Sequence, residues 1–310
     1  MKGCPAPHKQ SKKDILDFRP IELKDYGMLN KFLEHQPYRI CDYTRGVLYM
    51  WQEHLNYSYA ISHDMLIISS HLNNNTTFSI PLGKGDLYKA LDDIESFCAQ
   101  NGCPLNFHGV TKQSADLLTE YFGDRFEIKE IPNWGEYLYN FDDLLYLKGK
   151  KYHSKRNHIN GFKRLYPDYV YKKLTSKDIP AVKEFLKKYY SETSKDHFLF
   201  EIEKQMLYNV LDNYDRLDLK GGYIEVEGKM AAFAIGEKLR NTLYVHIEKA
   251  DKSYKGSYAV INNEFVKNNQ ESGVVFVNRE EDAGDQGLRK AKLSYYPVEI
   301  IKKYSVKERA

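Results

Sequence analysis

Hydrophobic and polar positions follow the same pattern in two stretches that lie half a chain apart. Residues 18–33 can be laid over residues 171–186 without a gap, so that a Lys-Asp pair and a Phe-Leu pair coincide. Each copy predicts a short strand, a capped turn and an amphipathic helix. In the second copy the apolar residues expected to be buried are Ile179, Val182, Phe185, Leu186 and Tyr189. The match indicates an internal duplication.

Alternating patterns after each predicted helix indicate β-hairpins. The first covers 57–70 with its turn near His63, and the second covers 222–236 with its turn at 227–229. Further elements are expected at 86–99 (helix), 104–107 (strand), 113–122 (helix), 136–139 (strand), 243–248 (strand), 258–268 (helix), 274–277 (strand), 285–294 (helix) and 298–304 (strand). Hairpins with helices between them, and no G-x-G-x-x-G motif, predict an α+β fold of mixed, mostly antiparallel sheets flanked by helices.

The same patterns divide the chain into four segments. Its 310 residues suit about two domains. We expect a disordered tail over 1–14, an N-terminal module over 15–147, a basic linker that opens the second module over 148–170, and a C-terminal module over 171–310.

Composition narrows the function classes. Lys and Arg number 46 against 43 Asp and Glu, so the net charge of +3 predicts no wholesale wrapping by nucleic acid. No stretch approaches the roughly 18 apolar residues of a membrane helix, and the polar start has no apolar core of a signal peptide, which predicts a cytoplasmic protein. The four cysteines have no zinc or redox spacing, so reduced thiols and no metal site are expected.

A basic strip forms the most charged part of the chain. Residues 148–164 contain seven Lys or Arg, two His and no acid. Such density predicts a local site for phosphates, whether of tRNA, a lipid head group, a coenzyme or another anionic small molecule. The candidate residues are Lys150, Lys151, Lys155, Arg156 and Asn157. The alternative is a solvated linker helix whose charges answer nearby acidic groups.

Carboxylates gather where two predicted strands of the second half end. Glu248 closes one strand, and 278–282 (Asn-Arg-Glu-Glu-Asp) follows the other. Glu248 and Glu280 are therefore candidates for taking a proton from an acceptor. Asn278, Arg279 and Asp282 are candidate substrate-binding groups beside them. The alternative is a structural salt-bridge network with the cations of the next helix.

The helix expected over 285–294 has two neighbouring stripes. Arg289 and Lys292 lie on one stripe and are expected to hold a phosphate or carboxylate. Tyr295 extends the other stripe and is expected to pack against a donor molecule or protonate it. The alternative is a helix that packs a tyrosine into the core and leaves its charges in water.

Several of these motifs together resemble a known family. They are 150–160 with Phe162 and 166–167, then 246–250, 278–282 and 288–297. They look like the signatures of an uncharacterised family similar to the C-terminal catalytic region of phosphatidylglycerol lysyltransferases and, more distantly, to Fem-type peptidyltransferases. The resemblance implies two tandem acyl-CoA N-acyltransferase-like (GNAT-like) modules. It also implies a donor cleft between the strands 243–248 and 274–278.

Three functions follow from the resemblance. The first is acyl transfer to an amine or hydroxyl acceptor, with charged tRNA as the aminoacyl donor. The second is a coenzyme A dependent N-acetyltransferase, for which Lys255 and Gly256 are the candidate cofactor residues. The loop 253–258 keeps only Gly256 of the glycine pattern that holds a pyrophosphate on backbone N–H groups. The third is a binding module that keeps the fold without turnover.

Overall fold

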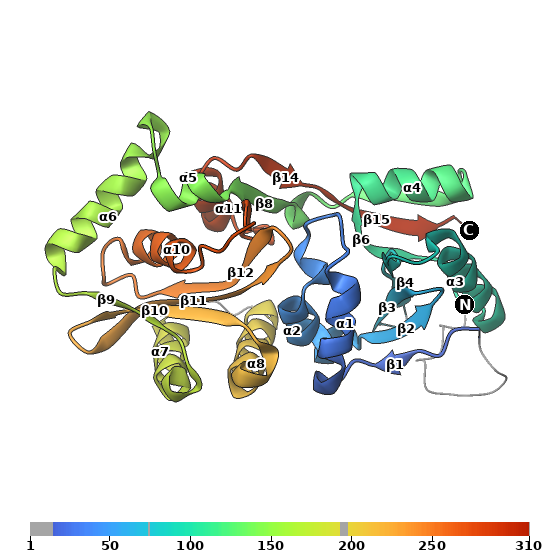
Figure 1. Ribbon diagram of the computed structural model, residues 1–310, viewed down its shortest axis with the longest axis horizontal. Coiled ribbons are helices and arrows are strands. Elements are labelled where there is room, and N and C mark those ends of the chain that lie inside the picture. The colour runs from blue at the N-terminus through green and yellow to red at the C-terminus, as the bar shows by residue number, and fades with distance from the viewer. Residues whose placement is uncertain (1–14, 74, 193–197, 310) are drawn as a thin grey trace. The chain divides into compact units, whose positions relative to one another are not determined.

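A computed structural model describes residues 15–73, 75–192 and 198–309, so the tail predicted over 1–14 lies outside the described residues (Figure 1). The chain forms two compact units. Unit 1 contains the described residues up to Glu136 together with 281–284 and 301–309, and unit 2 contains 137–280 and 285–300. Each unit is built on its own sheet.

Unit 1 has a sheet in which β4 and β6 are parallel neighbours and the other neighbouring strands are antiparallel. The strands lie in the order β1 (Arg19–Pro20), β2 (Ser58–Ser62), β3 (Met65–Leu72), β4 (Asn75–Phe78), β6 (Phe107–Thr111), β15 (Lys303–Glu308) and β7 (Phe126–Glu130), with β5 (Leu82–Gly83) on β3. Its helices are η1 (Leu23–Asp25), α1 (Tyr26–Leu33), η2 (Cys41–Tyr43), α2 (Arg45–Leu55), α3 (Leu87–Asn101), α4 (Lys112–Phe122) and η3 (Pro132–Trp134).

Unit 2 repeats this plan. Its strands lie in the order β14 (Glu299–Ile301), β8 (Glu136–Asn140), β13 (Phe276–Asn278), β12 (Thr242–Ala250), β11 (Lys229–Leu239), β10 (Lys220–Val226) and β9 (Val170–Lys173). Its helices are α5 (Phe141–Tyr146), η4 (Lys150–Tyr152), α6 (His153–Leu165), η5 (Ser176–Asp178), α7 (Ile179–Glu192), α8 (Phe198–Asp212), α9 (Tyr214–Leu217), α10 (Ser257–Asn268) and α11 (Gln286–Leu293). Helix α10 packs on β10, β11 and β12 and also contacts α5 and α6. Helices α7 and α8 lie on the other face of the sheet (Figure 1). The α+β prediction of two mixed sheets flanked by helices is confirmed.

The strands of the two sheets lie in equivalent orders when unit 1 is read from β1 and unit 2 from β9. In each sheet the sixth strand comes from the half of the sequence that forms most of the other unit. Strand β8 follows β7 in the chain and lies between β13 and β14, whereas β15 follows β14 and lies between β6 and β7. A parallel step, β4 to β6 in unit 1 and β12 to β13 in unit 2, falls at the same place in both orders. The final strand expected over 298–304 therefore divides into β14 and β15, and the C-terminal segment groups with unit 1 rather than with the module predicted over 171–310.

Buried charge fixes β15 in the sheet of unit 1. Lys303 is buried, and its Nζ forms an ion pair with Asp42 and a second one, 2.6 Å long, with Glu136 Oε1. Cys41, Asp42 and Glu136 also bring three potential metal ligands within 4.8 Å of one another, with the Lys303 ammonium bonded to two of them. Burial raises the pKa of Glu136 to about 7, although Lys303 opposes this shift.

The aligned stretches fold alike at their helix starts. Glu22 and Asp25 form a capping box before α1, and Thr175 and Asp178 form one before α7. The two aspartates are the ones that coincide when the copies are aligned. In α7 the buried tyrosine is Tyr190, not Tyr189 as expected.

Within the residues that the structure describes, no helix combines the length and the hydropathy that a membrane crossing needs.

A tyrosine hydroxyl closes the point where the parallel strands of unit 1 part. Strands β4 and β6 pair only at Phe78 and Phe107. Just beyond, the Tyr43 hydroxyl accepts a hydrogen bond from Ile80 N (3.3 Å) and donates one to Gly109 O (3.1 Å). Tyr43 is fully buried, so its side chain fills the space between the strands.

Removing this hydroxyl should destabilise the protein. Tyr43→Phe leaves a backbone N–H and a carbonyl without partners and should lower the free energy of unfolding by about 1–3 kcal/mol. Tyr57→Phe is the matched control, because Tyr57 is also buried in unit 1 and bonds its hydroxyl to no described residue. Urea unfolding of the three proteins measures the difference. Equal stabilities for the two variants would contradict the role of Tyr43.

Candidate functional site

The parallel strands β12 and β13 of unit 2 separate near their C-terminal ends, and charged side chains line the place where they separate. Strands β12 and β13 pair from Thr242 to Tyr244, and β12 then runs on to Ala250 without β13. Beyond this point β12 carries His246, where the register of β12 on β11 shifts, and Glu248. Their partners are consecutive residues of the loop that follows β13, Arg279 and Glu280.

A buried ion pair forms the centre of this site. Arg279 Nη2 donates to Glu248 Oε1 over 2.9 Å, and Asn262 Nδ2 of α10 donates to Glu248 Oε2, also over 2.9 Å. Arg279 is only 9% exposed and Asn262 only 2%. Both oxygens of Glu248 are therefore engaged, which favours a positioning role for Glu248 over the proton transfer expected of it. Asn262 was not predicted from the sequence, because it lies among mostly apolar buried residues of α10.

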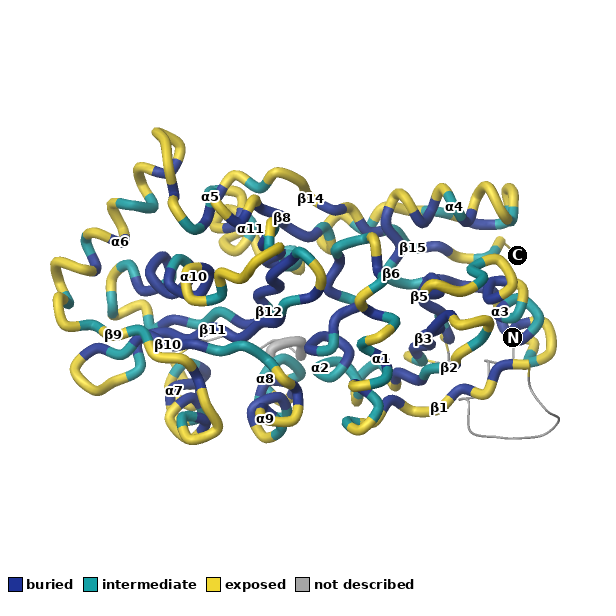
Figure 2. The backbone as a smooth tube through the Cα atoms, viewed as in Figure 1, coloured by how far each residue is buried: buried dark blue, intermediate teal, exposed yellow. Residues whose placement is uncertain are grey.

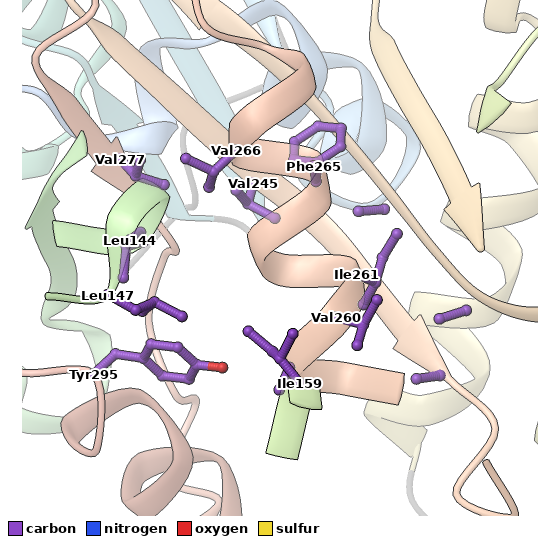
Figure 3. Close-up of a cluster of buried hydrophobic side chains, with 14 of the residues drawn as sticks. Leu144, Leu147, Ile159, Val245, Val260, Ile261, Phe265, Val266, Val277 and Tyr295 are labelled. Carbon is purple, nitrogen blue, oxygen red and sulfur yellow. The ribbon is translucent and has the colours of Figure 1, made fainter. Parts of the chain in front are cut away.

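Tyr295 packs against the ion pair and carries a second cation. Its ring centroid lies 4.9 Å from the Arg279 guanidinium carbon and 3.9 Å from Lys155 Nζ. In Figure 3 the Tyr295 ring borders the apolar cluster, with its oxygen pointing toward Ile159. Burial raises the pKa of Tyr295 to about 12 against the effect of Arg279, so the side chain stays a phenol. Tyr295 was predicted to pack against a donor molecule or to protonate it; in the structure its ring packs between Arg279 and Lys155.

Two polar atoms of the site have no partner among the described residues. They are Arg279 Nη1 and Asn262 Oδ1, both buried. A buried guanidinium N–H or amide oxygen that makes no hydrogen bond costs roughly 1–3 kcal/mol. The two atoms offer one donor and one acceptor to a bound molecule, beside the amine of Lys155.

A charged histidine holds the loop after β13. His246 Nε2 lies 2.9 Å from Glu237 Oε1 and its Nδ1 lies 2.6 Å from Glu280 Oε1, with the histidine side chain fully buried. Burial alone would lower the pKa of His246, but the bonds to both carboxylates raise it to about 10. Glu280 is thus occupied as a partner of His246, which does not favour the proton transfer expected of it. Sequence reasoning did not find Glu237, whose place is set by the register of β11.

The side chain of Lys292 holds the same loop by bonding to the loop's backbone carbonyls. The buried Nζ of Lys292 donates to the carbonyls of Arg279 (2.6 Å) and Glu280 (3.2 Å). Asn278 Oδ1 accepts from Glu280 N over 2.7 Å, and Glu280 adopts a left-handed φ of 58°. Lys292 and Asn278 therefore shape the loop, where the sequence analysis expected them to hold a substrate.

Two further candidates lie on this loop and on the helix after it. Asp282 belongs to unit 1, where its Oδ1 accepts from Gly284 N over 2.9 Å. Arg289 is half-buried on α11, one turn before Lys292.

The basic strip divides into inward and outward side chains, and Figure 2 shows most of α6 exposed. Lys155 faces the site, whereas Arg156 donates to the carbonyls of Leu147 and Gly149. Lys151 Nζ lies over the Tyr152 ring, 3.6 Å from Asp143 Oδ2. The exposed members include Lys150, Asn157, Lys163 and Arg164.

Gly256 has a packing reason to be glycine. It precedes α10 with a φ of 95°, and a Cβ there would meet the backbone oxygen of His158 in α6 at 2.7 Å. Helix α6 therefore packs directly against the loop that was the candidate pyrophosphate site. Lys255 is exposed beside it.

A protein-family profile matches most of the chain. The profile described as "Phosphatidylglycerol lysyltransferase, C-terminal" matches residues 35–307. The chain belongs to this family. The resemblance expected from the motifs is thereby confirmed.

Solved structures agree with membership of the phosphatidylglycerol lysyltransferase C-terminal family. A conserved protein of unknown function from Bacteroides thetaiotaomicron is 33% identical, with a TM-score of 0.88 over 95% of this chain and 100% of that one. The C-terminal domain of a putative lysylphosphatidylglycerol synthetase from Agrobacterium fabrum is 12% identical, with a TM-score of 0.62 over 86% of this chain and 87% of that one. FemX is 10% identical, with a TM-score of 0.63 over 93% of this chain and 96% of that one. At these identities the last two show the fold alone.

A curated relative matches part of the chain. An uncharacterised protein of Mycoplasmoides gallisepticum is 26% identical over 172 residues, which are 55% of this chain and 55% of that protein. The chain thus matches about half the length of this relative.

Proposed function

We propose that the protein transfers an aminoacyl group from charged tRNA to an amine or hydroxyl acceptor, and that the reaction takes place beside Arg279 in unit 2. The observation that carries the proposal is the buried guanidinium of Arg279, which is held by Glu248 and has an Nη1 donor without a partner among the described residues. The family supports an acyltransferase, and the geometry gives it a donor for a reacting carbonyl.

The chemistry follows from where negative charge develops. When the acceptor attacks the ester carbonyl carbon of the aminoacyl group, the carbonyl oxygen becomes an oxyanion. A fixed donor of positive charge in a site with little water stabilises that oxygen more than it stabilises the ground state. Arg279 Nη1 is such a donor, because Glu248 and the Tyr295 ring already fix the guanidinium plane. Asn262 Oδ1 can accept from the ammonium group of the same aminoacyl moiety.

Two features favour charged tRNA over coenzyme A as the donor. The backbone of α6 packs against Gly256, where a coenzyme A pyrophosphate would need free N–H groups. The exposed side of the strip carries Lys150, Lys163 and Arg164, which suit a polyanion that covers several phosphates at once.

Binding of tRNA should depend on the exposed cations of the strip. A triple change of Lys150, Lys163 and Arg164 to Glu should lower the affinity for charged tRNA by about tenfold at 0.1 M salt. It should also reduce the slope of log K against log salt by about one for each phosphate that the variant no longer neutralises. Filter binding with charged tRNA and calorimetry with acetyl-CoA measure the two donors separately.

The matched control changes the same net charge elsewhere in unit 2. Lys173, Lys177 and Lys187 are exposed, and their triple change to Glu should leave tRNA binding within about twofold of the wild type. Equal losses in the two triple variants would mean that net charge alone attracts tRNA. Micromolar or tighter binding of acetyl-CoA, without binding of charged tRNA, would favour the N-acetyltransferase instead.

A further inference from the structure

Lys155 differs from the other cations of the basic strip in where it points and what it meets. Its Nζ lies 3.9 Å from the Tyr295 ring centroid and donates to Ser294 Oγ over 2.5 Å. Among the described residues, no carboxylate forms an ion pair with it. Lys151, by contrast, lies 3.6 Å from Asp143 and is exposed.

The charges that face Lys155 disfavour a second cation in the site. Arg279 approaches from the loop after β13, Glu248 from β12, and the Tyr295 ring from the end of α11. Because Arg279 already neutralises Glu248, an ammonium at Lys155 adds an uncompensated positive charge to a half-buried place. Burial and then Arg279 lower the pKa of Lys155 to about 8, against the effect of Glu248. An appreciable part of the protein therefore holds a neutral amine at Lys155 near pH 8.

We propose that Lys155 is the proton-transfer residue of the reaction, which takes the proton of the acceptor as the new acyl bond forms. This rests on the aminoacyl transfer proposed above. The geometry that carries it is a half-buried amine beside the buried Arg279 donor, with a hydroxyl and a ring to fix its direction. Lys155 was predicted as a phosphate ligand, a role that an outward side chain of the strip fits better.

The proton and electron pairs balance within the site. The lone pair of the acceptor nitrogen or oxygen forms a bond to the ester carbonyl carbon, and the acceptor's proton passes to Nζ of neutral Lys155. The bond between that carbon and the ribose oxygen of tRNA then breaks. The ribose oxygen takes the proton back from the Lys155 ammonium, so the residue ends in the form in which it began.

Two substitutions separate proton transfer from anion binding. Lys155→Arg keeps the positive charge and can still hold a phosphate, but a guanidinium does not lose its proton in this pH range. Lys155→Ala removes both properties and leaves room for a small amine from solution. Lys173→Arg is the control, because Lys173 is exposed on β9 of the same unit.

The test is the pH profile of transfer from charged tRNA to phosphatidylglycerol vesicles and to a lysine-containing peptide. In the wild type, kcat/KM should rise to a plateau through an ionisation near pH 8. Both Lys155 variants should lose kcat by about a hundredfold and lose that ionisation, with the KM for charged tRNA within about twofold of the wild type. Trimethylamine, which has no N–H to be acylated, should restore part of the activity of Lys155→Ala.

Two results would overturn the proposal. One removes only the role of Lys155, and the other removes the proposed function as well. If the wild type transfers and Lys155→Arg keeps its rate and pH profile, Lys155 binds an anion and the proposed function stands. If the wild type transfers nothing from charged tRNA, the proposed function fails and the role of Lys155 fails with it.

Discussion

Arg279→Lys should bind charged tRNA normally and yet transfer its aminoacyl group about a thousandfold more slowly than the wild type. Lysine keeps the positive charge next to Glu248, but its compact ammonium cannot span both Glu248 and a reacting carbonyl as the guanidinium does. Loss of one fixed donor to a developing oxyanion costs about 10²–10³ in kcat, and loss of the planar contact with Tyr295 adds to it. Single-turnover transfer measures the effect apart from binding.

The control for this variant is a change that removes the charge. Arg279→Met leaves Glu248 buried without its cation and should lower the free energy of unfolding by about 3–5 kcal/mol, whereas Arg279→Lys should cost much less. Activity of Arg279→Lys within about threefold of the wild type would remove Arg279 from the reaction and leave it a structural ion pair.

His246→Gln should destabilise the protein by about 3–5 kcal/mol at pH 6, because it leaves Glu237 and Glu280 without the cation that they share. The pKa of His246 is raised to about 10, above its ordinary 6.5, so the folded state binds the proton more tightly than the unfolded chain does. The stabilisation is therefore complete below pH 6.5 and is lost as the pH rises toward 10. The difference between wild type and variant should shrink over that range in urea unfolding.

His108 of unit 1 is the control, because its pKa is shifted in the opposite direction to that of His246. Burial lowers the pKa of His108 to about 4, so the side chain is neutral throughout the range from pH 6.5 to 10. The stability difference between wild type and His108→Gln should stay constant there. A constant difference for His246→Gln as well would mean that His246 is not charged in the folded protein.

Local patterns were sufficient to predict most elements of the fold. The Lys-Asp pairs at 24–25 and 177–178 lie in the turns before α1 and α7, where Asp25 and Asp178 complete capping boxes. The exchange of β8 and β15 could not be predicted in this way. Both strands are short and carry charged residues beside apolar ones, so local pattern does not say which sheet each joins; packing and the buried ion pairs of Lys303 decide it.

The site was predictable in part for similar reasons. Glu248 lies near the end of β12 and Arg279 follows the neighbouring strand, so their proximity follows from the order of elements. The register shift at His246 could not be predicted in this way. Helical spacing also places Lys155 on the stripe of the buried Ile159 and Phe162, which is a signal in the sequence for its inward direction. Asn262 and Glu237 could not be found, because their pairing depends on helix orientation and strand register.

The most direct test of the account follows a labelled acyl group from two donors. Wild-type protein and Arg279→Lys are each given charged tRNA with a radiolabelled aminoacyl group, or radiolabelled acetyl-CoA. The acceptors are phosphatidylglycerol vesicles and a lysine-containing peptide. We expect label to move from tRNA to an acceptor with the wild type, the rate to fall about a thousandfold with Arg279→Lys, and acetyl-CoA to give no product. Acetylated peptide with tRNA left fully charged, or no movement of label from either donor, would contradict it.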